Sequence, residues 1–243
     1  MVRGLSSLRC SPHRPVLPPN PPFQFNAATV NDILHDAHHF GFAVGETKFD
    51  WNTLKTARDA YIARLNGIYA KNMANNKVEV ITGFGAFSGP NEVTVGTDKF
   101  TAQHILIAVG GKPFLPTIPG IEHCISSDGF FALDQQPRSV AVIGGGYIGV
   151  ELAGVFHSLG TKTEWFVREN QPLKNFDDLI VTTLLSESKK HGLTLNTFQT
   201  PTEVRKNADK TLTLVTAGGQ EWGPYDQVLF ATGRTPLTGN EDW

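Results

Sequence analysis

The sequence predicts an α/β fold in which the second half of the chain forms a doubly wound parallel sheet. Apolar runs alternate there with helical segments: runs at 140–143, 163–167, 193–195 and 227–231, and helices at 147–158 and 177–191. Continuous apolar runs are typical of parallel strands that are covered on both faces. Alternation of strands and helices is typical of a doubly wound sheet. A run of glycines also joins the first apolar run to the first helix, as a tight strand-to-helix turn requires.

The composition is that of an ordinary globular protein. The chain has 243 residues, of which 40% are hydrophobic and 18% charged, with a formal net charge of −2. This length allows one large domain or two small ones. A nearly neutral charge favours neither a nucleic acid nor a membrane surface as a partner. The longest apolar runs are too short to span a bilayer, and two cysteines with scattered histidines predict no metal site.

The first 25 residues differ from the rest of the chain. Six of the fifteen prolines lie between Pro12 and Pro22, and the first acidic residue is Asp32. One interpretation is an organellar transit peptide, since such leaders are basic and poor in acids. The others are a disordered, proline-rich tail or a sequence foreign to the domain that follows. We expect the cytoplasm as the location, with the mitochondrion as the alternative that a transit peptide would indicate.

The segment from Asn26 to residue 111 alternates between helical and strand periodicity. We expect a first helix from Asn26 to about His39, ended by Gly41, with one apolar face formed by Val30, Ile33, Leu34 and Ala37. The further expected elements are a helix at 51–73 capped by Asp50, a strand at 78–81, a hairpin around Gly89-Pro90-Asn91 and a buried strand at 104–109.

Gly144-Gly145-Gly146-Tyr147-Ile148-Gly149 matches G-x-G-x-x-G between a predicted strand and a predicted helix. In a Rossmann-like dinucleotide-binding domain, Gly144 would permit the tight turn and Gly146 would let the backbone approach the pyrophosphate. Gly149 would let the helix pack on the strand, and the helix N-terminus would offer free N–H groups. The alternative is a glycine turn that joins a strand and a helix without any ligand.

The end of the next predicted strand bears on the choice between NAD and NADP. An NAD site usually carries an acid about 20 residues after the glycines. Here Val167 is followed by Arg168, whose guanidinium can bind a 2′-phosphate, and Lys174 adds a second cation. These residues favour NADP. Glu169 points the other way if it reaches the ribose, and all three side chains could instead lie on a solvated loop.

Several motifs together resemble the flavin-dependent pyridine nucleotide-disulfide oxidoreductases, over about residues 26–238. The motifs are Asn26-Ala27-Ala28 with Leu34-His35-Asp36-Ala37, Arg64-Leu65-Asn66-Gly67-Ile68-Tyr69, Ile105 to Gly111 with Ile118-Pro119-Gly120, Gly146 to Gly154, Arg168 to Lys174 with Phe176-Asp177, and Ala231-Thr232-Gly233-Arg234. Within that family, the resemblance is to the members that reduce glutathione disulfide with NADPH and FAD, which serve redox homeostasis and are homodimers.

The resemblance implies a role for each matching residue. The NADPH site would comprise Gly144, Gly145, Gly146, Tyr147, Ile148, Gly149, Glu151, Arg168, Lys174 and Gly233, with Tyr147 covering the nicotinamide pocket. The residues near FAD would be Gly85, Gly110 and Arg234, and Tyr69 would lie near glutathione disulfide. Val167 replaces the acid of NAD-using members. Tyr69 could instead be a helix-packing residue.

The same resemblance predicts the domain organisation. Residues 1–25 would be the tail, 26–111 a partial FAD-binding domain, 112–234 the NADPH-binding domain and 235–243 a truncated return into the FAD domain. A flavin domain without its leading strand would expose sheet edges and apolar surface.

No catalytic residue of the family can be assigned. The family's Cys-x4-Cys pair should lie about ten residues before Asn26, where this chain has His13 and Pro18. Cys10 and Cys124 have no partner at a suitable spacing, and His35, His38 and His39 do not match the family's proton relay. The first flavin fingerprint, the relay and the dimer interface are not found either. We therefore expect an incomplete or mis-spliced chain that binds NADPH but reduces no disulfide.

Two rival hypotheses remain. The chain could be a noncatalytic NADPH-binding module, acting as a sensor or interaction protein. It could also belong to a flavin enzyme that reduces a different disulfide, although the segment from Arg64 to Tyr69 argues against this.

Overall fold

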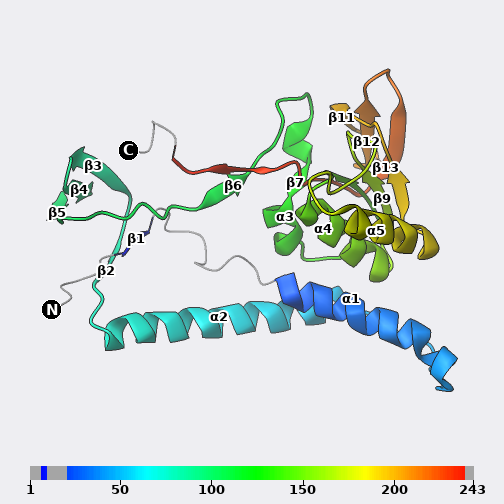
Figure 1. Ribbon diagram of the computed structural model, residues 1–243, viewed down its shortest axis with the longest axis horizontal. Helices are drawn as coiled ribbons and strands as arrows, with labels where there is room; N and C mark the ends of the chain where they lie inside the picture. The colour runs from blue at the N-terminus through cyan, green and yellow to red at the C-terminus, as the bar shows by residue number, and fades with distance from the viewer. Residues whose placement is uncertain (1–6, 10–20, 239–243) are drawn as a thin grey trace. The chain divides into compact units, whose positions relative to one another are not determined.

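The computed structural model describes residues 7–9 and 21–238 (Figure 1). The described residues form two compact units. The larger unit comprises residues 21–56 and 113–233, and the smaller unit comprises residues 7–9, 57–112 and 234–238. The chain passes between the units at 56/57, 112/113 and 233/234, whereas the expected domain boundaries were 25/26, 111/112 and 234/235. Residues 26–56, which we expected to belong with 57–111, are instead part of the larger unit.

A five-stranded parallel sheet forms the centre of the larger unit, as the sequence predicted. Its strand order is β10 (Thr194–Asn196), β9 (Lys162–Phe166), β8 (Ser139–Ile143), β14 (Gln227–Phe230) and β7 (Ile125–Ser126). Every neighbouring pair is parallel. The apolar run Val140 to Ile143 is buried throughout because β8 lies in the middle of the sheet and is covered on both faces.

The side chains of β8 alternate between two apolar cores. Val140 and Val142 pack with residues of α4 (Tyr147–Ser158), such as Phe156, on one face of the sheet. Ala141 and Ile143 belong to the core on the other face. That second face is covered by an antiparallel sheet rather than by helices (Figure 1). Its strands are β11 (Pro201–Lys206), β12 (Leu212–Thr216) and β13 (Glu221–Tyr225).

Two helices of the larger unit begin and end close to where the sequence signals predicted. Asp177 caps α5 (Asp178–Lys190), because its carboxylate accepts the N–H of Leu179 at 2.8 Å. Gly160 and Gly192 follow α4 and α5 with positive φ angles of 89° and 79°. The remaining short elements are η2 (Ile121–His123) and α3 (Ser127–Ala132), which precede β8 in the chain.

The first helix differs from its prediction in its start and in its buried face. Helix α1 (Pro21–Asp36) begins before Asn26, since prolines are tolerated in a first turn, and continues as η1 (Ala37–Phe40). Gln24 and Ala28 are its buried residues, whereas Val30 and Ile33 are more than half exposed. Polar contacts orient it against α4: Asn31 Nδ2 donates to Ser158 O at 2.7 Å, and Ser158 Oγ donates to Asp32 at 2.6 Å. The prediction that the face with Val30 and Ile33 is buried was therefore wrong.

Helix α2 (Trp51–Asn75) is capped by Asp50 as expected, whose carboxylate accepts the N–H of Asn52 at 2.9 Å. Its first residue, Trp51, is buried in the larger unit, where its ring stacks on Phe156 and its Nε1 donates to Leu133 O at 2.9 Å. The rest of the helix, from Ala57, belongs to the smaller unit.

The described strands of the smaller unit belong to three small sheets. Strand β1 (Ser7–Arg9) pairs with β2 (Val80–Thr82), and β6 (Gly111–Pro113) pairs with β15 (Arg234–Pro236). The predicted hairpin is present as β3 (Gly85–Gly89) and β4 (Glu92–Val95), extended by β5 (Asp98–Thr101).

The buried strand expected at 104–109 is absent, and that prediction was wrong. The segment is irregular, and Leu106 and Ile107 are 84% and 51% exposed. No strand among the described residues pairs with it, so its backbone lacks the hydrogen-bonding partner that a β-conformation requires. No helix in the described parts of the chain is long and apolar enough to cross a membrane.

Candidate functional site

Two glycines of the turn between β8 and α4 are required by the fold itself. Gly144 has a φ of 140°, and a Cβ atom there would lie 2.2 Å from the carbonyl oxygen of Ala231. A Cβ at Gly149 would lie 2.3 Å from the carbonyl oxygen of Gly144. Trp165 fixes the turn from the neighbouring strand, since its Nε1 donates to Gly144 O at 2.7 Å. The chain therefore turns sharply, and α4 packs tightly on the end of β8.

The other two glycines have no such structural requirement. Gly146 has ordinary angles, φ −83° and ψ 172°, and a Cβ there would meet nothing within 4 Å. A Cβ at Gly145 would meet its nearest atoms, in Val167 and Pro172, only at 3.5 Å. Neither the backbone conformation nor packing explains Gly146. The close approach of a ligand to the backbone would explain it.

The N-terminus of α4 is open to such a ligand. Gly146 is the N-cap residue, and no side chain caps the helix. The first N–H groups of a helix have no partner within it, and they carry a partial positive charge. Tyr147 is 57% exposed beside them, Ile148 is partly buried, and Glu151 is exposed one turn further along α4. The geometry suits an anion such as a pyrophosphate.

Backbone hydrogen bonds place the loop after β9 beside the glycine turn. The N–H of Leu173 donates to Gly145 O at 2.7 Å, and Leu173 itself is buried with a positive φ of 52°. At the other end of the loop, the N–H of Phe198 donates to Glu169 O at 3.1 Å. The fold thus brings Gly145 and the segment from Arg168 to Lys174 together, as the predicted site requires.

Three charged side chains of this loop form one cluster. Arg168 Nη2 and Lys174 Nζ each lie 3.2 Å from the same carboxylate oxygen, Oε1 of Glu169. Lys174 first, and then Arg168, hold the pKa of Glu169 below its ordinary value, so its carboxylate is ionised at neutral pH. The side chains of Arg168 and Lys174 are 72% and 57% exposed, which leaves both accessible to a phosphate.

Two further NADPH-site candidates lie elsewhere in the larger unit. Glu151 lines a cavity of about 230 Å³, whose other walls come from α1, α3 and α4. Gly233 has a φ of 131°, and its carbonyl accepts the N–H of Phe114 at 2.9 Å.

The residues assigned to FAD and to glutathione disulfide all lie in the smaller unit. Arg234 Nη2 donates to Gly111 O at 2.5 Å, and the N–H of Leu237 donates to Gly110 O at 3.0 Å. Gly85 is in a different sheet, and Tyr69 is a half-exposed residue of α2. Within the described ranges 7–9, 57–112 and 234–238, no strand, glycine turn and helix follow one another as they do at Gly144. The described residues of this unit therefore do not form a cradle that fits FAD.

The described residues contain no reactive thiol. Burial, and then Glu122, raises the pKa of Cys124 to about 12, so its thiol stays protonated at neutral pH. Its Sγ lies 3.7 Å from Gly120 O, within reach of a weak hydrogen bond. Cys10, His13 and Pro18 lie outside the described residues. His35, His38 and His39 are exposed where α1 passes into η1.

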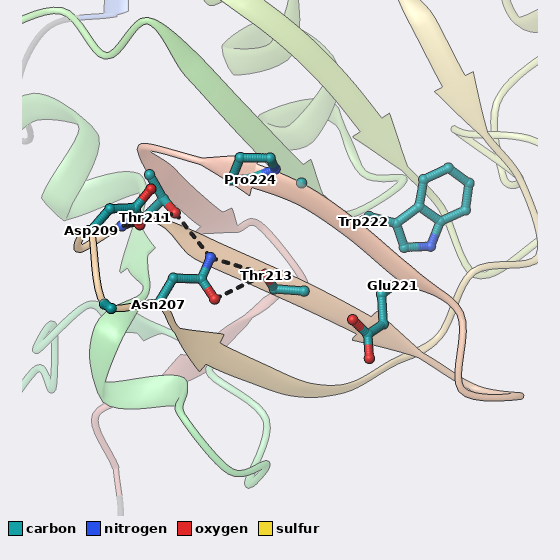
Figure 2. Close-up of a pocket in the computed structure, with 9 residues that line it drawn as sticks. Asn207, Asp209, Thr211, Thr213, Glu221, Trp222 and Pro224 are labelled. Atoms are coloured by element: carbon teal, nitrogen blue, oxygen red, sulfur yellow. Dashed lines mark hydrogen bonds between the residues drawn. The ribbon is translucent and has the colours of Figure 1, made fainter.

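A second hollow, of about 500 Å³, lies on the antiparallel sheet (Figure 2). Its polar groups bind one another: Asn207 Nδ2 donates to the hydroxyls of Thr211 and Thr213 at 2.9 and 3.1 Å. The ring of Trp222 packs against Phe166 at a centroid distance of 5.2 Å. No sequence signal pointed to this hollow, and its two carboxylates already have partners: Asp209 accepts from Thr211, and Glu221 pairs with Arg205.

The parallel sheet, the glycine turn and the cationic loop beside it define an α/β protein of the dinucleotide-binding class. Residues 24–242 match the pyridine nucleotide-disulphide oxidoreductase family, and the chain belongs to that family. It is 43% identical over 221 residues to a glutathione reductase of Schizosaccharomyces pombe, and the match covers 87% of this chain. It is 37% identical over 213 residues to the chloroplastic/mitochondrial glutathione reductase of Pisum sativum, again over 87% of this chain. The matches cover 47% and 38% of those relatives, so the chain spans less than half of their length.

Proposed function

We propose that this chain binds NADPH at the β8–α4 turn, and that it is part of a glutathione reductase-like enzyme. The family supports a redox role, and the names of the two relatives support glutathione disulfide as the substrate. The observation that carries the proposal is Gly146, a glycine that neither its backbone conformation nor its packing requires, beside a loop that presents two accessible cations.

Each part of the larger unit has a distinct task in this proposal. The free N–H groups at the start of α4 bind the pyrophosphate, and the clear space over Gly146 lets it approach. Arg168 and Lys174 bind the 2′-phosphate through charge-assisted hydrogen bonds. Tyr147, Ile148, Glu151 and Gly233 surround the remainder of the cofactor. NADPH supplies the hydride, and these residues hold and orient it.

The described residues carry the reaction no further than NADPH binding. The described residues of the smaller unit contain no strand, glycine turn and helix in succession, and the thiol of Cys124 stays protonated at neutral pH. We therefore assign no step to FAD or to a cysteine pair in this chain, and we expect no disulfide reduction by this chain alone. Disulfide-dependent NADPH oxidation by the pure chain, persisting after its thiols are alkylated, would contradict this expectation.

A noncatalytic NADPH-binding module is the second candidate, because the larger unit has its own sheet and two apolar cores. Limited proteolysis separates the two candidates. A protease-resistant product confined to the larger unit supports the module. In a separate thermal unfolding experiment, a single cooperative transition of the whole chain supports an enzyme domain pair.

A flavin enzyme for another disulfide is a third candidate, and Tyr69 is the residue whose substitution tests it. We expect the cytoplasm or mitochondrion as the location, and the pea relative carries an organellar name.

Gly146→Ala tests the proposed site. The new methyl group has room in the free protein but would stand where the pyrophosphate approaches, so NADPH affinity should fall at least about tenfold. Gly154→Ala is the matched control, since it makes the same change further along α4, where a Cβ also meets nothing within 4 Å. Fluorescence titration with NADPH measures both variants. Equal affinity in both would contradict the site.

A further inference from the structure

Glu169 occupies the position where Arg168 and Lys174 converge. Its Oε1 accepts both cations at 3.2 Å, although these are the groups that a 2′-phosphate would need. A carboxylate and a phosphate present similar acceptor oxygens to such donors. In the structure, then, the positive cluster is already neutralised in part by an anion from its own loop.

We propose that Glu169 determines the cofactor preference of this site, because it competes with the 2′-phosphate of NADPH and accepts the ribose 2′-hydroxyl of NADH. The inference rests on the proposed nucleotide function. In this inference Glu169 favours NADH, whereas Arg168 and Lys174 favour NADPH.

The competition follows from charge and geometry. When a 2′-phosphate binds Arg168 and Lys174, the carboxylate of Glu169 must leave both cations, because two anions at one position repel each other. Its backbone is fixed, since the N–H of Phe198 donates to Glu169 O. Its side chain is 43% exposed and can turn into solvent. The rotation breaks two ion pairs, which lowers NADPH affinity without moving the loop.

NADH binding does not require the carboxylate of Glu169 to move. It lacks the 2′-phosphate, so the carboxylate can stay between Arg168 and Lys174. Both cations bind Oε1, which leaves Oε2 without a partner among the described residues. An ionised carboxylate is a strong acceptor for the ribose 2′-hydroxyl, as in sites that are specific for NAD. Arg168 and Lys174 then act as supports that hold this acceptor in place.

Glu169→Gln tests the inference, because it keeps the shape of the side chain and removes its charge. NADPH should bind about three- to tenfold more tightly, since exposed ion pairs contribute modestly. NADH should bind about two- to fivefold more weakly, because a charged acceptor becomes neutral. Glu169→Ala should tighten NADPH similarly and weaken NADH further. Equilibrium titration of each cofactor by fluorescence at a fixed ionic strength measures these changes.

Glu122→Gln is the control, because it removes the same charge from an exposed position in η2, outside the loop. It should leave both affinities unchanged. Changes of the same sign for NADPH and NADH in Glu169→Gln, or unchanged NADPH affinity, would overturn the role of Glu169. Failure of the wild-type chain to bind either cofactor would instead refute the proposed function.

Discussion

Similar apolar runs take different structures in the two units of this chain: one is a buried strand, and the other is an irregular segment. The run Val140 to Ile143 forms part of the buried strand β8, whereas the run at 104–109, apolar from Ile105 onward, is irregular and mostly exposed. Strand β8 has hydrogen-bonded neighbours on both sides and apolar cores on both faces. The run at 104–109 has neither among the described residues. An apolar run therefore becomes a strand only where the surrounding chain supplies its partners.

Hydrogen exchange should show this contrast most strongly. Amides of β8 are buried in the sheet, so they should exchange only through opening of the larger unit, at least about a thousandfold more slowly than amides at 104–109. Mass spectrometry after a time course of deuteration measures both segments in one sample. Comparable protection at 104–109 would show that the segment is a paired strand in solution.

Gly149→Ala should give the next largest effect. Its Cβ would lie 2.3 Å from Gly144 O, so the helix and strand must move apart, at a cost of about 3 kcal/mol in the free energy of unfolding. That corresponds to a fall of about 6–12 °C in the Tm of the larger unit. Thermal unfolding followed by circular dichroism measures it. Gly146→Ala is the control and should stay within about 0.5 kcal/mol, because its Cβ meets no neighbour.

Asp226→Asn should have the smallest effect and a characteristic pH dependence. The carboxylate accepts the N–H of Arg138 at 2.8 Å and joins its guanidinium, which ties the start of β8 to the start of β14. The Arg138 side chain, with backbone N–H groups, lowers the pKa of Asp226, opposed by some desolvation. We expect a loss of about 1–2 kcal/mol at pH 7.

The sign of the pH dependence follows from the lowered pKa. The stabilisation by Asp226 is fully present above the unfolded-state pKa of about 3.9, and it is lost as the pH falls through the lower folded-state pKa. Denaturant titrations between about pH 6 and pH 2 should therefore show stability converging for the wild type and Asp226→Asn in acid. A constant difference across that range would contradict the ion pair.

Local signals in the sequence were enough to predict the parallel sheet of the larger unit and the ends of its helices α4 and α5. The glycines around α4, the caps of α2 and α5, and the apolar runs of β8 and β14 each act within a few residues of the chain, and the structure has each where it was expected. The approach of Leu173 to Gly145 could not be predicted, because it joins segments that only the folded sheet brings together. The shared oxygen of Glu169 is a side-chain detail of the same kind.

The sequence was a poorer guide where distant contacts decide. The apolar side of α1 predicted a buried face, but hydrogen bonds to Ser158 on α4 turn Val30 and Ile33 toward solvent. The antiparallel sheet on the second face of the parallel sheet was expected only as short β segments. Periodicity identifies the apolar face of a helix or strand, but it does not identify which element packs against that face.

The hydrogen bond from Leu173 to Gly145 sets the spacing between the glycine turn and the loop after β9. It fixes the spacing between the start of α4 and Lys174 through backbone atoms alone, so side-chain changes in the loop can alter charge without altering that spacing. The backbone spacing therefore stays fixed, whereas the charges of the side chains in the loop can change. In the proposed site, single substitutions at positions 168, 169 and 174 would change the cofactor preference while the backbone spacing between Gly145 and Leu173 stays constant.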